Sequence, residues 1–381
     1  MSSPNKIINL LFIFGTRPEA IKMAPVILLA KKNPGIRVTV CVTGQHREML
    51  DQVLDAFEIR QDIDLNLMKP QQTLSSMTAD TLNILAQVLA EKKPDCVVVH
   101  GDTTTTLAAS LAAYYSKIPV AHIEAGLRTH NIYSPWPEEI NRRITGSIAR
   151  IHFAPTASAQ ANLLAEAVPP DRIFVTGNTV IDALQMACER LDAQPTLTNH
   201  LLETIHWLDD RRRLILVTGH RRENFGEGFE GICHGLMRIA SRADVQLIYP
   251  VHLNPNVQAP VRKLLSNFNN IKLIDPLDYF CFVYLLRRST LVLTDSGGIQ
   301  EEAPSLGKPV LVMRNTTERP EAVSAGTAIL VGTDPVVIEH NVNKLLDNSS
   351  IYNKMSTAAN PFGDGNAAIR IITTLLEADL S

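Results

Sequence analysis

The chain has 381 residues, of which 45% are hydrophobic and only 5% aromatic. A formal net charge of −3 excludes a strongly basic protein that is drawn to nucleic acid or to anionic membranes. The five cysteines are scattered and form no Cys-x-x-Cys pair, which favours reduced thiols in the cytoplasm over a disulfide framework or a zinc site. No apolar stretch approaches the ~20 residues that span a bilayer, and at this length two domains are expected.

Short apolar runs alternate with helical patterns along the first half of the chain. Residues 7–14 are apolar, follow a single lysine and lead straight into Gly15, so we predict a buried first strand and no signal peptide. The other strands expected here are residues 38–43, 96–100, 120–124, 152–154 and 173–176.

The strand series restarts after a polar stretch around residues 190–213. Unbroken apolar strands spaced by helices predict parallel sheets covered on both faces. We therefore predict an α/β protein of two Rossmann-like domains facing across a cleft, residues 1–178 and 179–363, with a last helix in 364–381 packing back on the first. The strands expected in the second half are residues 214–218, 246–251, 271–273, 291–294, 309–313 and 328–331.

Conspicuous polar residues stand at the ends of the predicted strands. Ligands of open α/β sheets bind beyond the carboxyl ends of the strands. With two such domains facing each other, these ends would line one cleft. We therefore predict a single site built from side chains that are scattered along the chain: Arg17, Asp102, Glu124, His220, His252 and Ser296.

A turn with two glycines at residues 294–302 predicts a phosphate site. Ser296 is a good N-cap, and Gly297 and Gly298 let an anion approach the backbone N–H groups of a helix N-terminus. Glu302 lies one to two turns into that helix, where its carboxylate suits the two hydroxyls of a ribose. These features favour a nucleotide diphosphate, and an ordinary capped helix is the alternative.

Three carboxylates are candidates for proton transfer. Asp102 follows Gly101 at a strand end, and its alternative role is to cap the next helix. Glu124 terminates an apolar strand, where a desolvated carboxylate suits proton transfer near neutral pH, although a purely structural role remains the alternative. Glu138 opens a helix after the sequence Ser-Pro-Trp-Pro, and its alternative is a solvated acid in the first turn.

Basic residues also gather at predicted strand ends. His220 follows the first strand of the second half, where it could shield or protonate a leaving phosphate with help from Arg221 or Arg222. A buried histidine with satisfied hydrogen bonds is the alternative. A guanidinium suits a phosphate in the same way. The other basic residues with a predicted phosphate role are Arg17, Lys22 and Arg319.

Residues 226–231 fit the dinucleotide pattern G-x-G-x-x-G only literally. The true fingerprint follows its strand directly, whereas residues 219–225 intervene here, and the next strand ends at His252 without an acidic residue for a ribose. We interpret the segment as a loop that leads into a helix. Because no Walker A sequence and no metal-ligand spacing is present either, we expect neither a cofactor nor a metal.

Taken together, these motifs resemble the non-hydrolysing UDP-N-acetylglucosamine 2-epimerases of bacteria, in order and over nearly the whole chain. The resemblance implies the two-Rossmann arrangement called GT-B, a homodimer, and interconversion of UDP-GlcNAc and UDP-ManNAc for surface-polysaccharide synthesis. The segments that carry it are residues 14–22, 44–47, 100–104, 122–128, 134–139, 141–142, 218–223, 250–255, 295–308 and 317–320.

The resemblance also implies residue roles. Lys22 would lie near the sugar or its phosphates, as would the three carboxylates, which are the family's catalytic candidates. At one base-contacting position Leu277 replaces the glutamine of some relatives, which matters only if the side chain makes that contact. Glu48 and Gln71 differ from residues with which some relatives bind a second, activating UDP-GlcNAc. The implied nucleotide contacts are Arg17, His220, Phe282, Ser296, Gly297, Gly298, Glu302 and Arg319.

The chemistry favours elimination. No carbonyl adjoins C2 of a nucleotide sugar, so inversion there requires transient oxidation or loss of the leaving group. We expect anti elimination of UDP to 2-acetamidoglucal and re-addition to the other face, with one or two of the three carboxylates moving the C2 proton. A GT-B glycosyltransferase, a hydrolysing epimerase and a UDP-sugar sensor are the alternatives.

Overall fold

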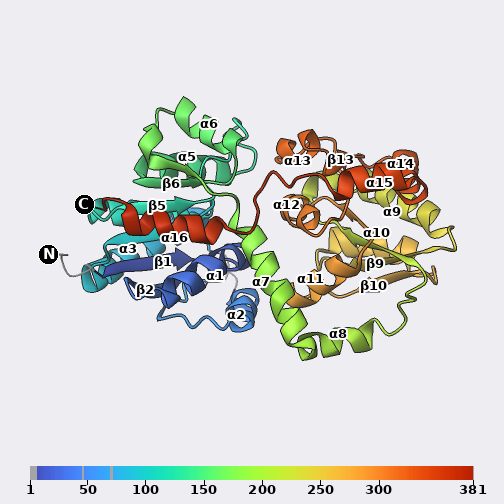
Figure 1. Cartoon of the computed structure of the whole chain (residues 1–381), viewed down its shortest axis with the longest axis horizontal. Coiled ribbons are helices and arrows are strands. Elements are labelled where there is room, and N and C mark those ends of the chain that lie inside the picture. The colour runs from blue at the N-terminus through green and yellow to red at the C-terminus, as the bar shows by residue number, and fades with distance from the viewer. Residues whose placement is uncertain (1–6, 45–46, 69–71, 381) are drawn as a thin grey trace. The chain divides into compact units, whose positions relative to one another are not determined.

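The computed structural model describes residues 7–44, 47–68 and 72–380. Gln45, His46 and Gln71, which belong to or follow the resembling segment 44–47, lie outside these residues. The chain forms two compact units, one of residues up to 183 together with those from 362 onward, the other of residues 184–361. The boundary falls within the long helix α7 (Thr179–Ala193), as Figure 1 shows.

The first unit is built on a parallel sheet of seven strands in the order β3-β2-β1-β4-β5-β6-β7. The strand order reverses between β1 and β4, which is the point where ligands bind in doubly wound sheets. The strands are β1 (Ile8–Phe14), β2 (Ile36–Val42), β3 (Ile63–Asp64), β4 (Cys96–His100), β5 (Val120–Ile123), β6 (Ile151–Ala154) and β7 (Ile173–Val175).

The second unit repeats this topology in a parallel sheet of six strands, ordered β10-β9-β8-β11-β12-β13. Its order reverses between β8 and β11. The two sheets confirm the predicted α/β class with two Rossmann-like folds. The strands are β8 (Arg213–Thr218), β9 (Val245–Pro250), β10 (Ile271–Ile274), β11 (Leu291–Thr294), β12 (Val310–Val312) and β13 (Ala328–Leu330).

Helices connect the parallel strands and flank both sheets (Figure 1). Besides α7, those of the first unit are α1 (Arg17–Lys32), α2 (Arg47–Ala56), α3 (Leu74–Lys92), α4 (Thr104–Tyr115), α5 (Glu138–Ile148), α6 (Ala157–Ala165) and α16 (Ala367–Glu377). Those of the second are α8 (Asn199–Thr204), α9 (Glu227–Ala240), α10 (Pro255–Leu265), α11 (Tyr279–Arg288), α12 (Gly297–Ser305), α13 (Pro320–Ser324), α14 (Pro335–Asp347) and α15 (Ser349–Ser356).

Helix α16 belongs to the first unit although the second unit precedes it in the chain. It packs against α1. Its N-terminus is capped from a distance, because the carboxylate of Asp182 accepts hydrogen bonds from Ala367 N at 3.3 Å and Ala368 N at 2.8 Å. The pKa of Asp182 is nevertheless raised, because burial outweighs these two bonds.

Each unit has its own apolar core, formed by alternate residues of its central strands. In the first unit, Leu11 and Ile13 of β1 share one core with Val97 and Val99 of β4. Alternate residues point to the same face of a strand, so helix-covered faces collect these side chains. The core of the second unit contains the equivalent residues Ile215, Val217, Leu291 and Leu293.

The strand ends differ from the sequence prediction in two instructive places. The expected strand 120–124 ends at Ile123, because Glu124 has φ +62° and leaves the extended conformation. Strand β3, which comprises only Ile63 and Asp64, was not predicted, since two residues carry no alternating pattern.

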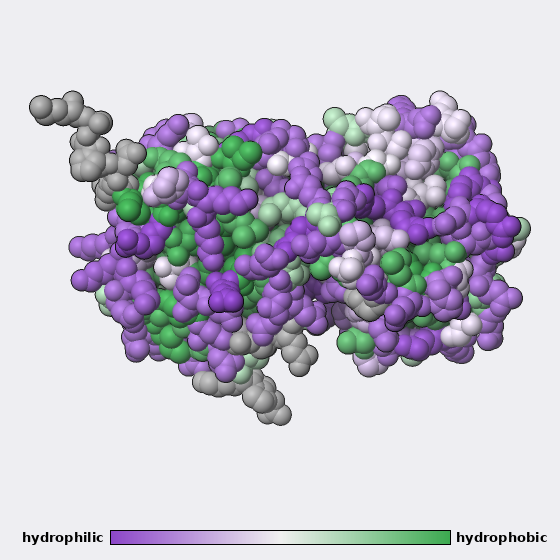
Figure 2. All heavy atoms as spheres, turned by 60° about the horizontal axis from the view of Figure 1, so that its bottom comes forward, coloured by the Kyte–Doolittle hydropathy of each residue, from purple (hydrophilic) through white to green (hydrophobic). Residues whose placement is uncertain are grey.

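The face drawn in Figure 2 is mostly hydrophilic, with hydrophobic patches on both units. The exposed large apolar side chains include Tyr114 and Tyr115 at the end of α4, which are 61% and 68% exposed. Among the described residues, the structure contains no helix with the length and apolarity to span a membrane.

Candidate active site

Glu124 is the centre of the polar cluster in the first unit. It follows β5 directly, and its carboxylate forms an ion pair with Lys22 Nζ. Asn178 Nδ2 donates to the same oxygen, Glu124 Oε2, at 2.7 Å, and His100 Nε2 lies 4.0 Å from it. The side chain of Glu124 is only 8% exposed. A buried carboxylate thus meets one cation and one amide donor, and both stabilise its ionised form.

Helix α1 brings Arg17 and Lys22 to this end of the sheet. The helix starts where the sequence provides a capping box, since Thr16 accepts from Glu19 N and the Glu19 side chain accepts from Thr16 N. Arg17 is the first helical residue and is half-buried. Lys22 lies about one turn further along, where its amine reaches Glu124. The structure therefore places both predicted basic residues beyond β1.

Glu19 is a structural organiser of the site that the functional prediction did not include. Its carboxylate accepts from Gly15 N at 2.9 Å and Thr16 N at 2.8 Å, and also from the hydroxyls of Thr103 at 2.6 Å and Thr106 at 3.2 Å. It thereby ties the turn after β1 to the start of α4. Burial raises the pKa of Glu19 in spite of these hydrogen bonds. The pattern Thr-x-x-Glu is the sequence signal that announces it.

Asp102 is held by an arginine and does not cap a helix. Arg142 approaches Asp102 Oδ2 with Nε at 2.8 Å and Nη2 at 2.6 Å, and Asn141 Nδ2 donates to Asp102 O at 2.8 Å. The N-cap of α4 is Thr103, whose hydroxyl accepts from Thr106 N. The capping role considered for Asp102 is therefore wrong, because the following threonine fulfils it.

Glu138 belongs to α5, the helix whose Asn141 and Arg142 contact Asp102. It is the first residue of α5, three and four positions before Asn141 and Arg142, so the three side chains share one helix face. Its Oε2 atom is buried, and among the described residues it has no hydrogen-bond partner. The next residue, Glu139, is fully buried and accepts from Thr129 N at 3.0 Å. Glu139 is thus structural, while Glu138 offers an unused acceptor.

Three histidines are buried on neighbouring strands beside this cluster: His100, His122 and His152. Burial lowers the pKa of His100 to about 4, of His122 to about 3 and of His152 to about 4. All three are therefore neutral at pH 7. His122 Nε2 bonds to Gly101 O at 2.7 Å, whereas neither ring nitrogen of His100 has a hydrogen-bond partner within the described part of the chain.

In the second unit, the N-terminus of α12 is open. Ser296 occupies the N-cap position, but its side chain makes no capping hydrogen bond, so the prediction of a serine cap is only half right. Its backbone N–H donates to Thr294 Oγ1 at 2.9 Å. The N-terminal amides of α12 therefore lack the usual serine oxygen, which leaves room for the oxygen of a ligand.

Two guanidinium groups converge on this helix end. A Cβ atom built on Gly297 would lie 3.7 Å from Arg221 Nη2, 3.8 Å from Glu318 Oε2 and 3.9 Å from Arg319 Cζ. Arg319 is 8% exposed and is fixed by an ion pair with Glu301, which is also buried. Two guanidinium groups beside a helix N-terminus suit an anion, which would share them with the carboxylates of Glu318 and Glu301. Arg221 was predicted only to assist His220 at a phosphate, whereas its position places it directly at the N-terminus of α12.

His220 reaches the same place from the end of β8. The backbone N–H of His220 donates to both carboxylate oxygens of Asp295, at 2.9 and 3.1 Å. The backbone N–H of Arg221 donates to Asp295 Oδ2 at 2.9 Å. His220 Nδ1 lies 3.5 Å from Asp295 Oδ1, and the ring stacks on His252 at 5.5 Å between centroids. Desolvation lowers the pKa of His220, and Asp295 opposes this shift. Asp295, which was not predicted, fastens the His220 loop to α12.

Glu302, Leu277 and Phe282 complete the second cluster. Tyr279 donates its hydroxyl hydrogen to Glu302 Oε1 at 2.9 Å, which joins the start of α11 to α12. Leu277 precedes Asp278, the N-cap of α11, and Phe282 lies in the first turn of that helix; both are partly exposed. The predicted residues of the second half therefore collect around the N-termini of two adjacent helices.

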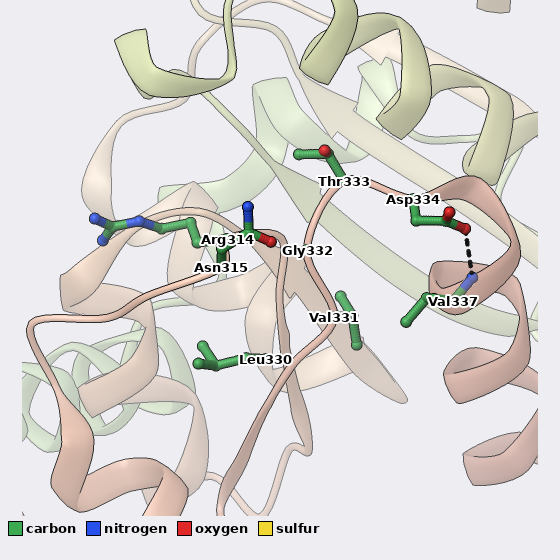
Figure 3. Close-up of a pocket in the computed structure, with 8 residues that line it drawn as sticks. All are labelled: Arg314, Asn315, Leu330, Val331, Gly332, Thr333, Asp334 and Val337. Carbon is green, nitrogen blue, oxygen red and sulfur yellow. Dashed lines mark hydrogen bonds between the residues drawn. The ribbon is translucent and has the colours of Figure 1, made fainter.

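A cavity of about 370 Å³ lies at the carboxyl ends of β12 and β13 (Figure 3). In the figure, the guanidinium of Arg314 extends away from Thr333 and Val337. None of the residues expected to bind substrate lines this cavity. Its lining residues are Arg314, Asn315, Leu330, Val331, Gly332, Thr333, Asp334 and Val337. Over the described ranges, no group of three or more His, Cys, Asp or Glu side chains could hold a metal ion.

Known proteins are similar to this chain over nearly its whole length. The family profile described as UDP-N-acetylglucosamine 2-epimerase matches residues 29–376. A "Probable UDP-N-acetylglucosamine 2-epimerase" of Ralstonia nicotianae is 58% identical over 95% of this chain and 97% of its own length. The UDP-N-acetylglucosamine 2-epimerase of Escherichia coli O157:H7 is 57% identical over 96% of this chain and 98% of its own.

A solved structure agrees with the fold as well. The crystal structure of UDP-GlcNAc 2-epimerase from Neisseria meningitidis bound to UDP-GlcNAc matches with a TM-score of 0.91 and 53% identity, over 97% of this chain and all of that one. The match confirms the GT-B-type fold class and the resemblance to non-hydrolysing bacterial enzymes. On identity and coverage alike, the chain belongs to the UDP-N-acetylglucosamine 2-epimerase family.

Proposed function

We propose that the chain interconverts UDP-GlcNAc and UDP-ManNAc by reversible inversion at C2. The observation that carries the proposal is the 53% identity and TM-score of 0.91 with an epimerase that was crystallised with UDP-GlcNAc. The two polar clusters supply what the reaction requires. One offers carboxylates beyond a strand end, and the other offers an anion site at a helix N-terminus.

The second unit is proposed to hold the UDP leaving group. The N-terminal amides of α12 at Gly297 and Gly298, with Arg221 and Arg319 beside them, stabilise the negative charge that develops as the C1–O bond breaks. His220, whose pKa is lowered by burial, donates a hydrogen bond to the same phosphate in its neutral form. Arg17 is a further phosphate ligand, Glu302 binds the ribose, and Leu277 and Phe282 lie at the base.

The first unit is proposed to move the C2 proton. A carboxylate removes the hydrogen on C2, the electron pair of that C–H bond forms the C1=C2 double bond, and UDP departs with the electrons of the C1–O bond. The intermediate is 2-acetamidoglucal. Re-addition of UDP to C1 and delivery of a proton to the opposite face of C2 complete the inversion. No single step of this elimination and re-addition transfers electrons to an acceptor, so this route, unlike transient oxidation, needs no redox cofactor.

The contacts of the three carboxylates suggest a division of labour. Arg142 engages Asp102 Oδ2 with two nitrogen atoms, so Asp102 is proposed to organise α5 against the strand end. Glu124 and Glu138 are the better candidates for proton transfer, since inversion requires a group on each face of C2. Lys22 keeps Glu124 ionised and lies close enough to share its substrate.

The alternatives share the fold but differ in products. A GT-B glycosyltransferase passes the sugar to an acceptor, a hydrolysing epimerase releases free ManNAc and UDP, and a sensor leaves UDP-GlcNAc unchanged. A sensor would have no use for the buried Glu138 oxygen, which has no hydrogen-bond partner within the described residues.

Product analysis separates these functions. Purified protein is incubated with UDP-GlcNAc alone, without metal, nicotinamide cofactor or acceptor, and the nucleotide sugars are resolved by chromatography. We expect UDP-ManNAc to appear and the same mixture to form when the reaction starts from UDP-ManNAc. Stoichiometric release of UDP with free ManNAc, or no change at all, would contradict the proposal.

We further propose a cytoplasmic homodimer that supplies surface-polysaccharide synthesis. The five cysteines are unpaired and four of them are buried, which suits a reducing compartment. The exposed Tyr114 and Tyr115 offer apolar area for a subunit contact. Light scattering of the purified protein should give twice the chain mass of 42.0 kDa, whereas a monomer would refute the dimer alone.

A further inference from the structure

Asn178 connects Glu124 to the segments through which the chain leaves and re-enters the first unit. Its Nδ2 donates to Glu124 Oε2 at 2.7 Å, and its backbone N–H donates to Phe362 O at 2.7 Å. Its Oδ1 accepts from Val180 N, in the first turn of α7, at 3.1 Å. The residue is only 3% exposed. One side chain therefore touches the carboxylate, the outgoing helix and, through its backbone, the returning segment.

The main chain fixes this crossing of two segments. Gly177 has φ +87° and Gly363 has φ +133°, which are conformations that other residues rarely adopt. A Cβ atom on Gly177 would lie 3.2 Å from Gly363 Cα and 3.3 Å from Phe362 O. Because the two backbones touch with no side chain between them, the position of Asn178 is closely determined.

An amide donor at this place has a chemical consequence. A hydrogen bond to the charged form of a carboxylate favours that form and also fixes its direction. Lys22 supplies charge from a flexible stem, whereas the short, buried side chain of Asn178 supplies direction. Both groups contact the same oxygen, Glu124 Oε2. Because the carboxylate is planar and rigid, fixing Oε2 also fixes the direction of Oε1.

We propose that Asn178 is a positioning residue, which holds the Glu124 carboxylate ionised and in its reactive orientation from the crossing of residues 177–178 with 362–363. The proposal rests on the proposed function, in which Glu124 moves the C2 proton. It goes beyond that function by assigning the orientation of the base to the two connections between the units.

A purely structural role of Asn178 as the cap of α7 is separable from this one. Asparagine, aspartate and serine cap helices about equally well. In Asn178→Asp the oxygen that accepts from Val180 N is retained, while the donor to Glu124 becomes a second carboxylate. Asn178→Ser also retains a cap and removes the donor without adding charge. A structural role therefore predicts no kinetic change in either variant.

The test measures kcat, KM and the pH profile of kcat/KM for UDP-GlcNAc epimerisation. For Asn178→Asp we expect kcat to fall about tenfold or more and the acid limb to move up by about one pH unit, because a like charge favours protonated Glu124. For Asn178→Ser we expect a smaller loss of kcat with little change in KM. Asn9→Ala is the control, since Asn9 Nδ2 donates to the Asp95 carboxylate at 2.8 Å near the amino ends of β1 and β4, opposite the carboxyl ends where Glu124 lies.

The possible results have distinct meanings. Wild-type kinetics and pH profile in Asn178→Asp, with an active wild-type enzyme and an inactive Glu124→Gln variant, would overturn this inference alone. An active Glu124→Gln variant would overturn it together with the role of Glu124. A wild-type protein without epimerase activity would overturn the proposed function first and this inference with it.

Discussion

At the scale of single residues, the backbone of Glu124 is the most informative feature of the site. Its φ of +62° puts a long charged residue into the left-handed region, which costs about 1–2 kcal/mol for any residue with a Cβ atom. Glycine would remove that cost, and Gly126 and Gly101 nearby show that the chain uses glycine at such positions. Other described non-glycine residues, Lys93 and Lys117 among them, share a positive φ, so the strain points to a functional role only together with the buried contacts of Glu124.

We therefore expect Glu124→Gln to abolish most turnover. The amide is close to isosteric but cannot accept a proton, so kcat should fall about 10²-fold or more while KM changes little. Steady-state kinetics with UDP-GlcNAc measure both constants. Glu166→Gln is the control, because Glu166 is also an ion-paired acid of the first unit, with Arg128 at 2.7 Å, but has no contact with the site. Equal losses in the two variants would point to stability and not to catalysis.

At the scale of elements, the start of α12 is suited to binding a ligand at the expense of the stability of the helix. Ser296 does not cap it, and two glycines begin it, although glycine is a poor helix former. The same end collects Arg221 and Arg319. This helix start is thus less stable than one with a capping side chain and better helix formers. In return, its N-terminal backbone N–H groups stay open to a ligand.

Gly297→Ala should consequently change stability and binding in opposite directions. The backbone of Gly297 is helical, and the new Cβ would meet its nearest neighbour at 3.7 Å, an ordinary contact. We expect unfolding to become harder by about 0.4–1 kcal/mol, because alanine restricts the unfolded chain. The methyl group crowds the anion site, so UDP should bind about tenfold more weakly. Calorimetric titration measures the UDP affinity, and thermal unfolding measures the stability. An unchanged UDP affinity would show that α12 is not part of the site.

Elements were easier to predict from the sequence than contacts. The apolar runs indicated all strands except β3, and the restart after residue 213 indicated the second sheet. The sequence did not predict the site roles of Arg142, Asn178 and Asp295. Each contacts a partner 40 to 75 residues away, and no local pattern encodes such a pair. The serine cap and the Asp102 cap failed for a related reason, since propensity cannot tell which neighbouring residue or ligand completes a helix start.

At the scale of the whole molecule, two sheets with the same strand order carry different chemistry. The first unit buries three neutral histidines on β4, β5 and β6, next to the carboxylates. The second carries the helix ends and arginines suited to an anion. Because a buried neutral histidine is protonated more easily after unfolding, this division makes the first unit sensitive to acid.

The pKa values fix the direction and the window of this sensitivity. Above about pH 6.5 these histidines are neutral in both states, so their contribution to stability is complete. Between pH 6.5 and about 4 these histidines bind protons in the unfolded chain but stay neutral in the folded one. The free energy of unfolding should therefore fall as the pH falls. Each histidine adds up to about 1.4 kcal/mol per pH unit to that slope.

Hydrogen exchange of the amides in β4, β5 and β6 from pH 7 to 4.5, corrected for intrinsic rates, measures the slope. His100→Leu should flatten it by about one proton, since neither ring nitrogen of His100 makes a hydrogen bond within the described residues. The exposed His234 provides the control substitution His234→Gln, which should leave the slope unchanged. Equal slopes in all three proteins would contradict the assignment of acid sensitivity to the buried ring.

The central claim is that UDP leaves while a carboxylate takes the hydrogen from C2, and solvent deuterium tests it most directly. The protein is incubated with UDP-GlcNAc in D2O, and both nucleotide sugars are examined by proton NMR and mass spectrometry. The account predicts one deuterium at C2 of UDP-ManNAc and of the recovered UDP-GlcNAc, and formation of labelled UDP-ManNAc about 10²-fold or more slower with Glu124→Gln. Epimerisation that retains the original hydrogen at C2 would contradict the account, because it would require a route without proton exchange.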